Sequence, residues 1–134
     1  MDVLLDTHIF LWWDSQVARL GEAAKALISS PSNRVFVSAV SIWEIAIKRR
    51  VGKLAFEGSP VDAIGKNAFL ELPISGRDCE AAGALDWTHA DPFDRLIMAQ
   101  AQVRGLTLIT ADAAMRDFIG VAMVSGLKES QGSP

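Results

Sequence analysis

The chain begins with MDVLLD at residues 1–6, a short apolar run that ends abruptly in an acidic residue. Comparable apolar runs, each flanked by polar residues or glycine, lie at 35–37, 69–74, 106–109 and 121–124. Runs this apolar leave no face of a strand for water. Each of them therefore indicates a short strand that is buried on both faces of a sheet.

Helix start signals fall between these runs. Ser15, Ser38, Ser59, Ser75 and Asp91 each precede a stretch with helical spacing of apolar residues. Two of them are followed directly by proline, and Ser75 has an acid, Asp78, three residues later, as is typical of helix N-termini. Strands that alternate with helices predict a central, mostly parallel sheet covered on both sides. The predicted fold is a three-layer α/β/α domain.

Length and composition fit a single domain of this kind. The 134 residues are 50% hydrophobic and 22% charged, as in soluble globular proteins. We expect residues 1–124 to form the domain and residues 125–134 to form a flexible C-terminal tail. The lone Cys79 excludes an internal disulfide, and the N-terminus has no signal-peptide pattern. A cytoplasmic protein is expected.

Four carboxylates are expected at one edge of the sheet. Asp6 ends the first strand, Asp112 ends the fourth, Asp94 lies in the first turn of the helix after Asp91, and Glu44 lies on the helix after the second strand. Ligands of open parallel sheets bind at the carboxyl ends of the strands. Carboxylates gathered there repel one another unless cations bind, and Mg²⁺ or Mn²⁺ suits both oxygen ligands and phosphate substrates. The four acids are therefore the candidate metal ligands and catalytic residues.

A protein with a net charge of −3 can bind nucleic acid only if its negative charges are confined to one place, away from the rest of the binding surface. Without the four candidate acids, thirteen basic side chains stand against twelve acidic ones. The negative charge is thus concentrated in the predicted site, where bound cations would offset it and allow a phosphate to approach.

Each acid also has a purely structural interpretation. Glu44 is spaced to pair with Lys48 one helix turn later. Asp91, directly before a proline, is best explained as a helix cap, and Asp94 suits the positive end of the helix dipole. The acids at strand ends also suit turns. Only the joint placement of the four favours a functional site.

Other polar residues have less specific patterns. We expect His8 and His89 to be hydrogen-bonded structural groups, because neither has a second histidine or cysteine at metal-ligand spacing. Thr7 and Thr110 adjoin the first and last candidate acids and are candidates for hydroxyls that steady them. A basic cluster is equally compatible with a solvated helix end and with phosphate contact; it consists of Lys48, Arg49, Arg50 and Lys53.

Four blocks of the sequence carry a family resemblance. They are LLDTH at 4–8, SAVSIWEIAIK at 38–48, HADPFDRLIMAQA at 89–101 and LITAD at 108–112. In order and spacing they resemble the signature motifs of PIN domains, and specifically of the VapC-type toxins of bacterial toxin–antitoxin pairs. The resemblance extends from Asp2 to about Val124.

This resemblance implies a metal-dependent endoribonuclease, which cleaves RNA phosphodiester bonds and thereby arrests translation and growth. It places the four acidic positions of the family on Asp6, Glu44, Asp94 and Asp112, with Mg²⁺ or Mn²⁺ as cofactor. It also implies a VapB-type antitoxin as partner and a homodimer. Arg95 matches a pattern of one subgroup, without an assigned role.

In-line attack by a metal-activated water on an RNA phosphodiester fits such a site. One alternative is a phosphatase of another acidic-pocket α/β fold. The dehalogenase type needs a second carboxylate two residues after the first, whereas Asp6 is followed by Thr7 and His8. The other alternative is a non-catalytic PIN-fold module that binds protein. The presence of all four acids argues against this alternative.

Overall fold

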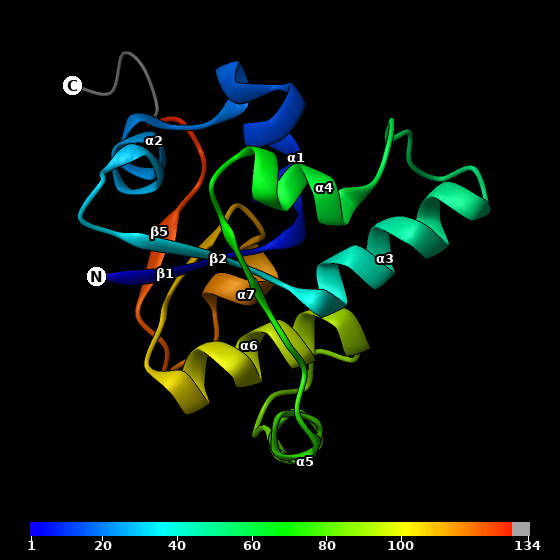
Figure 1. The fold of residues 1–134 in the computed structure, drawn as a ribbon. Coiled ribbons are helices and arrows are strands. Elements are labelled where there is room, and N and C mark those ends of the chain that lie inside the picture. Colours follow the sequence, from blue (N-terminus) through cyan, green and yellow to red (C-terminus); the bar gives the residue numbers. More distant parts are fainter. Residues whose placement is uncertain (130–134) are drawn as a thin grey trace.

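The structure, a computed structural model, describes residues 1–129 and is built around one five-stranded sheet (Figure 1). The strand order is β3-β2-β1-β4-β5, and all neighbouring strands are parallel. The strands are β1 (Asp2–Leu5), β2 (Arg34–Ser38), β3 (Leu70–Leu72), β4 (Thr107–Thr110) and β5 (Met123–Ser125). The predicted parallel sheet is confirmed.

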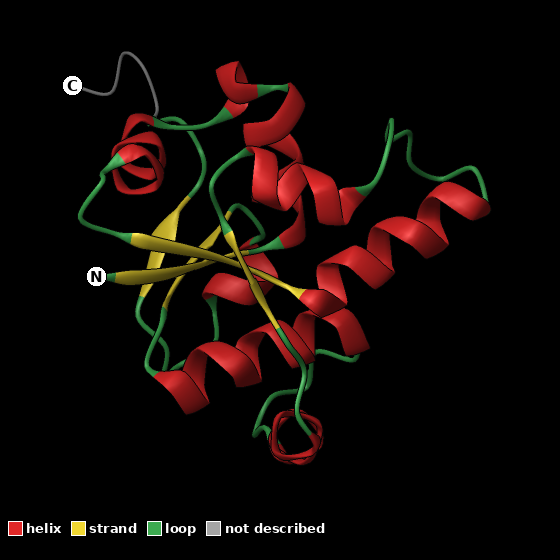
Figure 2. Cartoon of the chain, viewed as in Figure 1, coloured by secondary structure: helices red, strands yellow, loops and turns green. Residues whose placement is uncertain are grey.

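Helices cover both faces of this sheet (Figure 2). In chain order they are α1 (Thr7–Ser15), the 3-10 helix η1 (Val17–Arg19), α2 (Glu22–Ser29), α3 (Ala39–Arg50), α4 (Pro60–Lys66), α5 (Gly76–Ala84), α6 (Pro92–Arg104) and α7 (Ala113–Arg116). Helices α1, α2 and α4 lie on one side, and α6 and α7 lie on the other, with α5 packed outside α6. The three-layer α/β/α prediction is confirmed. Within the described part of the chain, no helix is both long and apolar enough to cross a membrane.

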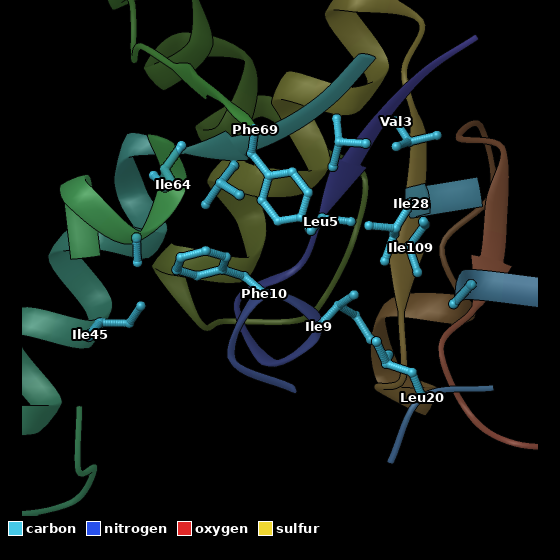
Figure 3. Close-up of a cluster of buried hydrophobic side chains, with 14 residues drawn as sticks. Val3, Leu5, Ile9, Phe10, Leu20, Ile28, Ile45, Ile64, Phe69 and Ile109 are labelled. Atoms are coloured by element: carbon cyan, nitrogen blue, oxygen red, sulfur yellow. The ribbon is translucent and has the colours of Figure 1, made fainter. Parts of the chain in front are cut away.

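Side chains of the central strand β1 alternate between two cores. Val3 and Leu5 are fully buried in a cluster with Phe10, beneath α1, α2 and α4 (Figure 3). Leu4 points to the opposite face and packs with Ile97 of α6. Burial of each such side chain stabilises the fold by about 1.5–3 kcal/mol. A strand with no exposed apolar position is what the continuous run at residues 3–5 predicts.

Most predicted helix starts are also confirmed. Ser38, Ser59, Ser75 and Asp91 all act as N-caps, since the side chain of each accepts a hydrogen bond from a backbone N–H in the first turn. At Ser75 the bonding is reciprocal, because the Asp78 carboxylate accepts a hydrogen bond from the backbone N–H of Ser75. Each cap satisfies donors that the helix itself leaves unpaired.

The prediction of a helix start at Ser15 is wrong. Ser15 is the last residue of α1, which begins at Thr7 with Asp6 as its N-cap. The acid that ends β1 therefore also starts a helix, with no loop between the two elements. Asp112 likewise caps α7, with only Ala111 between it and the end of β4.

The packed fold extends beyond the predicted boundary at residue 124. Ser125 belongs to β5, and Gly126 donates its N–H to the carbonyl of Thr110 and accepts a hydrogen bond from the N–H of Gly21, each at 2.9 Å. A Cβ at Gly126 would lie 2.2 Å from Cδ1 of Ile9, which favours glycine there. Residues 130–134 of the predicted tail lie outside the described residues.

Candidate active site

The strand order creates a switch point at the carboxyl edge of the sheet. From β1 the chain moves outward through β2 and β3, and it then returns to place β4 on the other side of β1. Loops diverge at such a point, which is where open parallel sheets bind ligands. Asp6 and Asp112 follow these two adjacent strands, and the N–H of Asp6 donates to the carbonyl of Ile109 at 3.0 Å.

Asp6 is held on both carboxylate oxygens. Its Oδ1 accepts the backbone N–H of His8 at 2.9 Å, and its Oδ2 accepts the hydroxyl of Thr110 at 2.5 Å. The residue is only 4% exposed. Burial raises the pKa of Asp6 above its ordinary value, and the negative charge of Glu44 adds to the rise. Asp6 is thus a fixed, desolvated carboxylate.

Thr110 steadies two acids, as the sequence predicts. Its Oγ1 donates to Asp6 and accepts the backbone N–H of Asp112 at 3.1 Å. Thr7 does not have the predicted role. Its hydroxyl bonds instead to that of Ser41 at 2.7 Å, and so ties the start of α1 to α3.

Glu44 is buried on α3 with one oxygen unpaired. Its Oε2 accepts Nζ of Lys48 at 2.5 Å, which confirms the predicted pair and raises the pKa of Lys48. Its Oε1 is buried and has no hydrogen-bond partner among the described residues. An unpaired buried carboxylate oxygen is costly, so this atom is available to accept a hydrogen bond or to bind a cation.

Asp94 lies in the first turn of α6 against His89, whose Nε2 is 2.7 Å from its Oδ2. Burial raises the pKa of Asp94 to about 6, and the charges of Asp91 and Asp6 contribute to this rise. Asp91 is the helix cap, as predicted, and accepts the N–H of Phe93 at 2.9 Å and of Asp94 at 3.2 Å. The prediction that His89 is a hydrogen-bonded group is likewise confirmed.

Arg95 has a structural role that the sequence does not reveal. Its guanidinium donates to backbone carbonyls at the end of α5 and in the loop before α6; they belong to Ala82, Gly83, Leu85, Trp87 and His89. These include carbonyls that the end of a helix leaves unpaired. The residue next to Asp94 therefore fixes the loop that carries His89.

Asp112 is the exposed member of the four acids. Its Oδ1 accepts the N–H of Ala114 at 2.9 Å, as an N-cap of α7. Together with Asp6 it lines a cavity of about 240 Å³, which we call the acidic hollow. The other residues of the acidic hollow are His8, Trp12, Ala111 and Leu127.

The four acids are predicted to converge on a metal ion, but the structure does not bring them together into a closed metal site. Across residues 1–129, no three acidic, histidine or cysteine side chains are grouped closely enough to hold a metal ion. Two of the four acids are paired with other side chains, Glu44 with Lys48 and Asp94 with His89. The donor chemistry nevertheless fits a divalent cation, since Oε1 of Glu44 is unpaired and hard divalent cations favour carboxylate oxygens as ligands.

Comparison with known proteins agrees with this architecture. Ribonuclease VapC22 of Mycobacterium tuberculosis is 29% identical over 117 residues, which cover 85% of this chain and 89% of that protein. A toxin–antitoxin complex from Klebsiella pneumoniae contains a chain of 22% identity and TM-score 0.65, covering 95% of this chain and 99% of that one. VapBC2 from Rickettsia felis, solved with a promoter DNA fragment, matches at 15% identity and TM-score 0.68, over 93% and 98%.

At such identities the two solved structures demonstrate the shared fold. The decisive comparison is with the family model for the PIN domain, which matches residues 3–120. That range runs from β1 to beyond α7 and includes all four candidate acids. The chain belongs to the PIN domain family.

Proposed function

We propose that this protein is a Mg²⁺- or Mn²⁺-dependent endoribonuclease that acts in the cytoplasm as the toxin of a VapBC-type toxin–antitoxin pair. The observation that carries the proposal is the buried carboxylate of Glu44, unpaired on Oε1, within electrostatic reach of Asp6. Membership of the PIN family and the ribonuclease name of the relative from Mycobacterium tuberculosis support the same activity.

Asp6 and Asp94 are the residues that we propose to hold the cation, with Glu44 and Asp112 completing the site. When bound, the cation would supply positive charge at the scissile phosphate and lower the pKa of the attacking water. The repulsion that raises the pKa values of Asp6 and Asp94 would be relieved by this charge.

The surrounding side chains keep these carboxylates in place. Thr110 and the N–H of His8 restrict Asp6 to one orientation, and His89 holds one oxygen of Asp94. Lys48 binds Oε2 of Glu44 and leaves Oε1 available. Preorganised acids of this kind need little rearrangement when substrate and ion arrive, which is the main source of electrostatic catalysis.

A cleavage assay tests the proposal. Purified protein, separated from any partner, is incubated with single-stranded RNA in Mg²⁺, in Mn²⁺ and in excess EDTA. We expect cleavage only with the ions, and a loss of at least about a hundredfold in Asp6→Asn. Asp62→Asn changes an exposed first-turn acid on α4 that does not line the acidic hollow, and it should retain full activity. Equal cleavage in EDTA would disprove metal dependence.

A VapB-type antitoxin and a homodimer are the proposed protein partners. The complex from Klebsiella pneumoniae supports the former, because it is a toxin–antitoxin assembly. An exposed apolar stripe along α3 and its C-cap supports association through a helix face; it comprises Trp43, Ile47 and Val51, which are 58%, 38% and 60% exposed. Light scattering at tens of micromolar should show a dimer, and a strictly monomeric species would contradict that part.

A further inference from the structure

The basic cluster at the end of α3 separates into residues with different environments. Arg49 is occupied, because its guanidinium donates to the carbonyls of Phe56 at 3.2 Å and Gly58 at 2.7 Å and so holds the loop after the helix. Arg50 is exposed to solvent. Two lysines remain, and the backbone brings them together.

A tight turn at the end of α3 places Lys53 beside Lys48. Gly52 adopts a φ of 79°, the left-handed conformation that glycine reaches without strain. Its N–H donates to the carbonyl of Arg49 at 3.2 Å, and the N–H of Lys53 donates to the carbonyl of Lys48 at 2.8 Å. This pattern reverses the chain at a helix end. Lys53 therefore returns to the last turn of α3 and does not extend away from it.

The two lysines line a cavity of about 220 Å³ between α1 and the end of α3, which we call the basic hollow. Its lining includes His8, Leu11, Glu44, Lys48, Lys53 and Leu54. Lys48 is partly neutralised by Glu44, whereas Lys53 makes no ion pair within residues 1–129. The hollow thus combines an available positive charge with two leucine side chains. That combination suits a phosphate attached to a sugar or base.

His8 lines both the basic hollow and the acidic hollow, so the two cavities adjoin at this side chain. Trp12 lies on the acidic side and faces the His8 ring edge-on, with 6.5 Å between ring centroids. A strand bound in the acidic hollow would therefore have to pass only the His8 side chain to reach the basic hollow. This continuity favours a nucleic-acid strand over a separate small anion.

We propose that the basic hollow is a subsite for the RNA phosphodiester that neighbours the one being cut. Lys53 and Lys48 contact this phosphate, and Leu11 and Leu54 pack against the attached nucleoside. The inference rests on the proposed ribonuclease function and extends it, because it assigns part of the substrate path to residues outside the four acids.

The test measures RNA binding without cleavage. In an Asp6→Asn background with EDTA, fluorescence anisotropy gives the Kd of a labelled short single-stranded RNA of mixed sequence over a series of salt concentrations. Lys53→Gln should raise the Kd about fivefold at low salt and reduce the slope of log Kd against log salt by about 0.7, the value for one phosphate on a single strand. Arg50→Gln removes the same charge from the same helix end but does not line the hollow, so it should change the Kd less than about twofold.

The possible outcomes are distinct. Equal effects of Lys53→Gln and Arg50→Gln would overturn the subsite, since only general charge would then matter. Unchanged RNA binding in Lys53→Gln together with lost binding of a polyglutamate peptide would assign the hollow to protein carboxylates and also overturn it. Failure of the proposed function is recognised separately, because the wild-type protein would then not cleave RNA in Mg²⁺ or Mn²⁺. Lys53 is exposed, and thermal melting checks that the variants remain folded.

Discussion

His89 Nε2 lies 2.7 Å from Asp94 Oδ2, so the acid at the start of α6 is held by a side chain from the loop before that helix. The Trp87 ring stacks on His89 with 4.6 Å between centroids, and Arg95 donates to the carbonyls of both residues. Asp91 caps the same helix. The block HADPFDR at 89–95 is therefore one structural unit whose members together orient Asp94.

We predict that Arg95→Lys destabilises the protein by about 2–3 kcal/mol. A lysine keeps the charge but cannot reproduce a planar guanidinium that donates to carbonyls from the end of α5 to the following loop. Urea denaturation measures the free energy of unfolding. Arg116→Lys, an exposed arginine at the end of α7, is the matched control and should change it by less than about 0.5 kcal/mol. Equal effects of the two substitutions would contradict the role of Arg95.

The pH dependence of stability should differ between the wild type and Asp94→Asn. Burial, with the charges of Asp91 and Asp6, raises the pKa of Asp94 from 3.8 to about 6 in the folded, metal-free chain. The folded state then holds this proton more tightly than the unfolded state, so its contribution to stability is full below about pH 4 and is lost as the pH rises through about 6. An asparagine undergoes no such loss.

In EDTA at pH 7 we therefore expect Asp94→Asn to be more stable than the wild type by about 1–2 kcal/mol. This gain is smaller than the full pKa shift would give, because the Asp94 side chain is 17% exposed and solvent screens part of the repulsion. The excess should disappear near pH 4. Urea denaturation at several pH values measures it. A constant difference across this range would show that Asp94 ionises in the folded chain as it does in the unfolded one.

The sequence predicts the order and direction of the strands well, but the edge strand β3 is largely exposed and is not buried on both faces as expected. It predicts the first helix poorly, for a physical reason. Continuous apolar runs such as residues 3–5 have few alternatives to a buried strand. The helix α1 is apolar through its centre, from Ile9 to Trp13, so it lacks the periodicity that reveals an amphipathic helix. Its cap, Asp6, also ends β1 and leaves no loop as a signal. The helix α7 has only four residues, too few for a pattern.

The sequence also places the candidate acids at one sheet edge, because strand ends and helix starts are local features. It does not reveal what faces each acid. The contact of Lys48 with Glu44 follows from helical spacing and was predictable, whereas the contacts of Arg95 depend on where α5 ends and how the next loop turns. The same holds for the basic hollow, which requires α1 and the end of α3 to be adjacent.

The C-terminal segment packs against the start of α2, so two glycine-to-alanine substitutions should change the free energy of unfolding in opposite directions. A Cβ at Gly21 would lie 2.2 Å from the backbone oxygen of Leu127, so Gly21→Ala should displace this segment and destabilise the protein by about 1–3 kcal/mol. Gly83→Ala meets no atom within 4 Å on α5 and should stabilise by about 0.5–1 kcal/mol. Thermal melting distinguishes the two. A neutral Gly21→Ala would show that residues 126–127 pack only loosely.

Metal addition tests the acidic site independently of RNA cleavage. A divalent cation that binds the folded chain and not the unfolded one stabilises it by about 2.7 kcal/mol at a hundred times its Kd. Added Mg²⁺ or Mn²⁺ should therefore raise the melting temperature of the wild type, as Glu44 Oε1 gains a partner and the repulsion between Asp6 and Asp94 is relieved. The substitution Asp94→Asn removes both a charge that repels the other acids and a ligand for the ion. The variant should melt higher than the wild type in EDTA and gain much less from Mn²⁺, whereas Asp62→Asn should gain as much as the wild type. If Asp94→Asn instead melts lower in EDTA and keeps the full rise with Mn²⁺, Asp94 serves only to start α6 and the ion binds elsewhere.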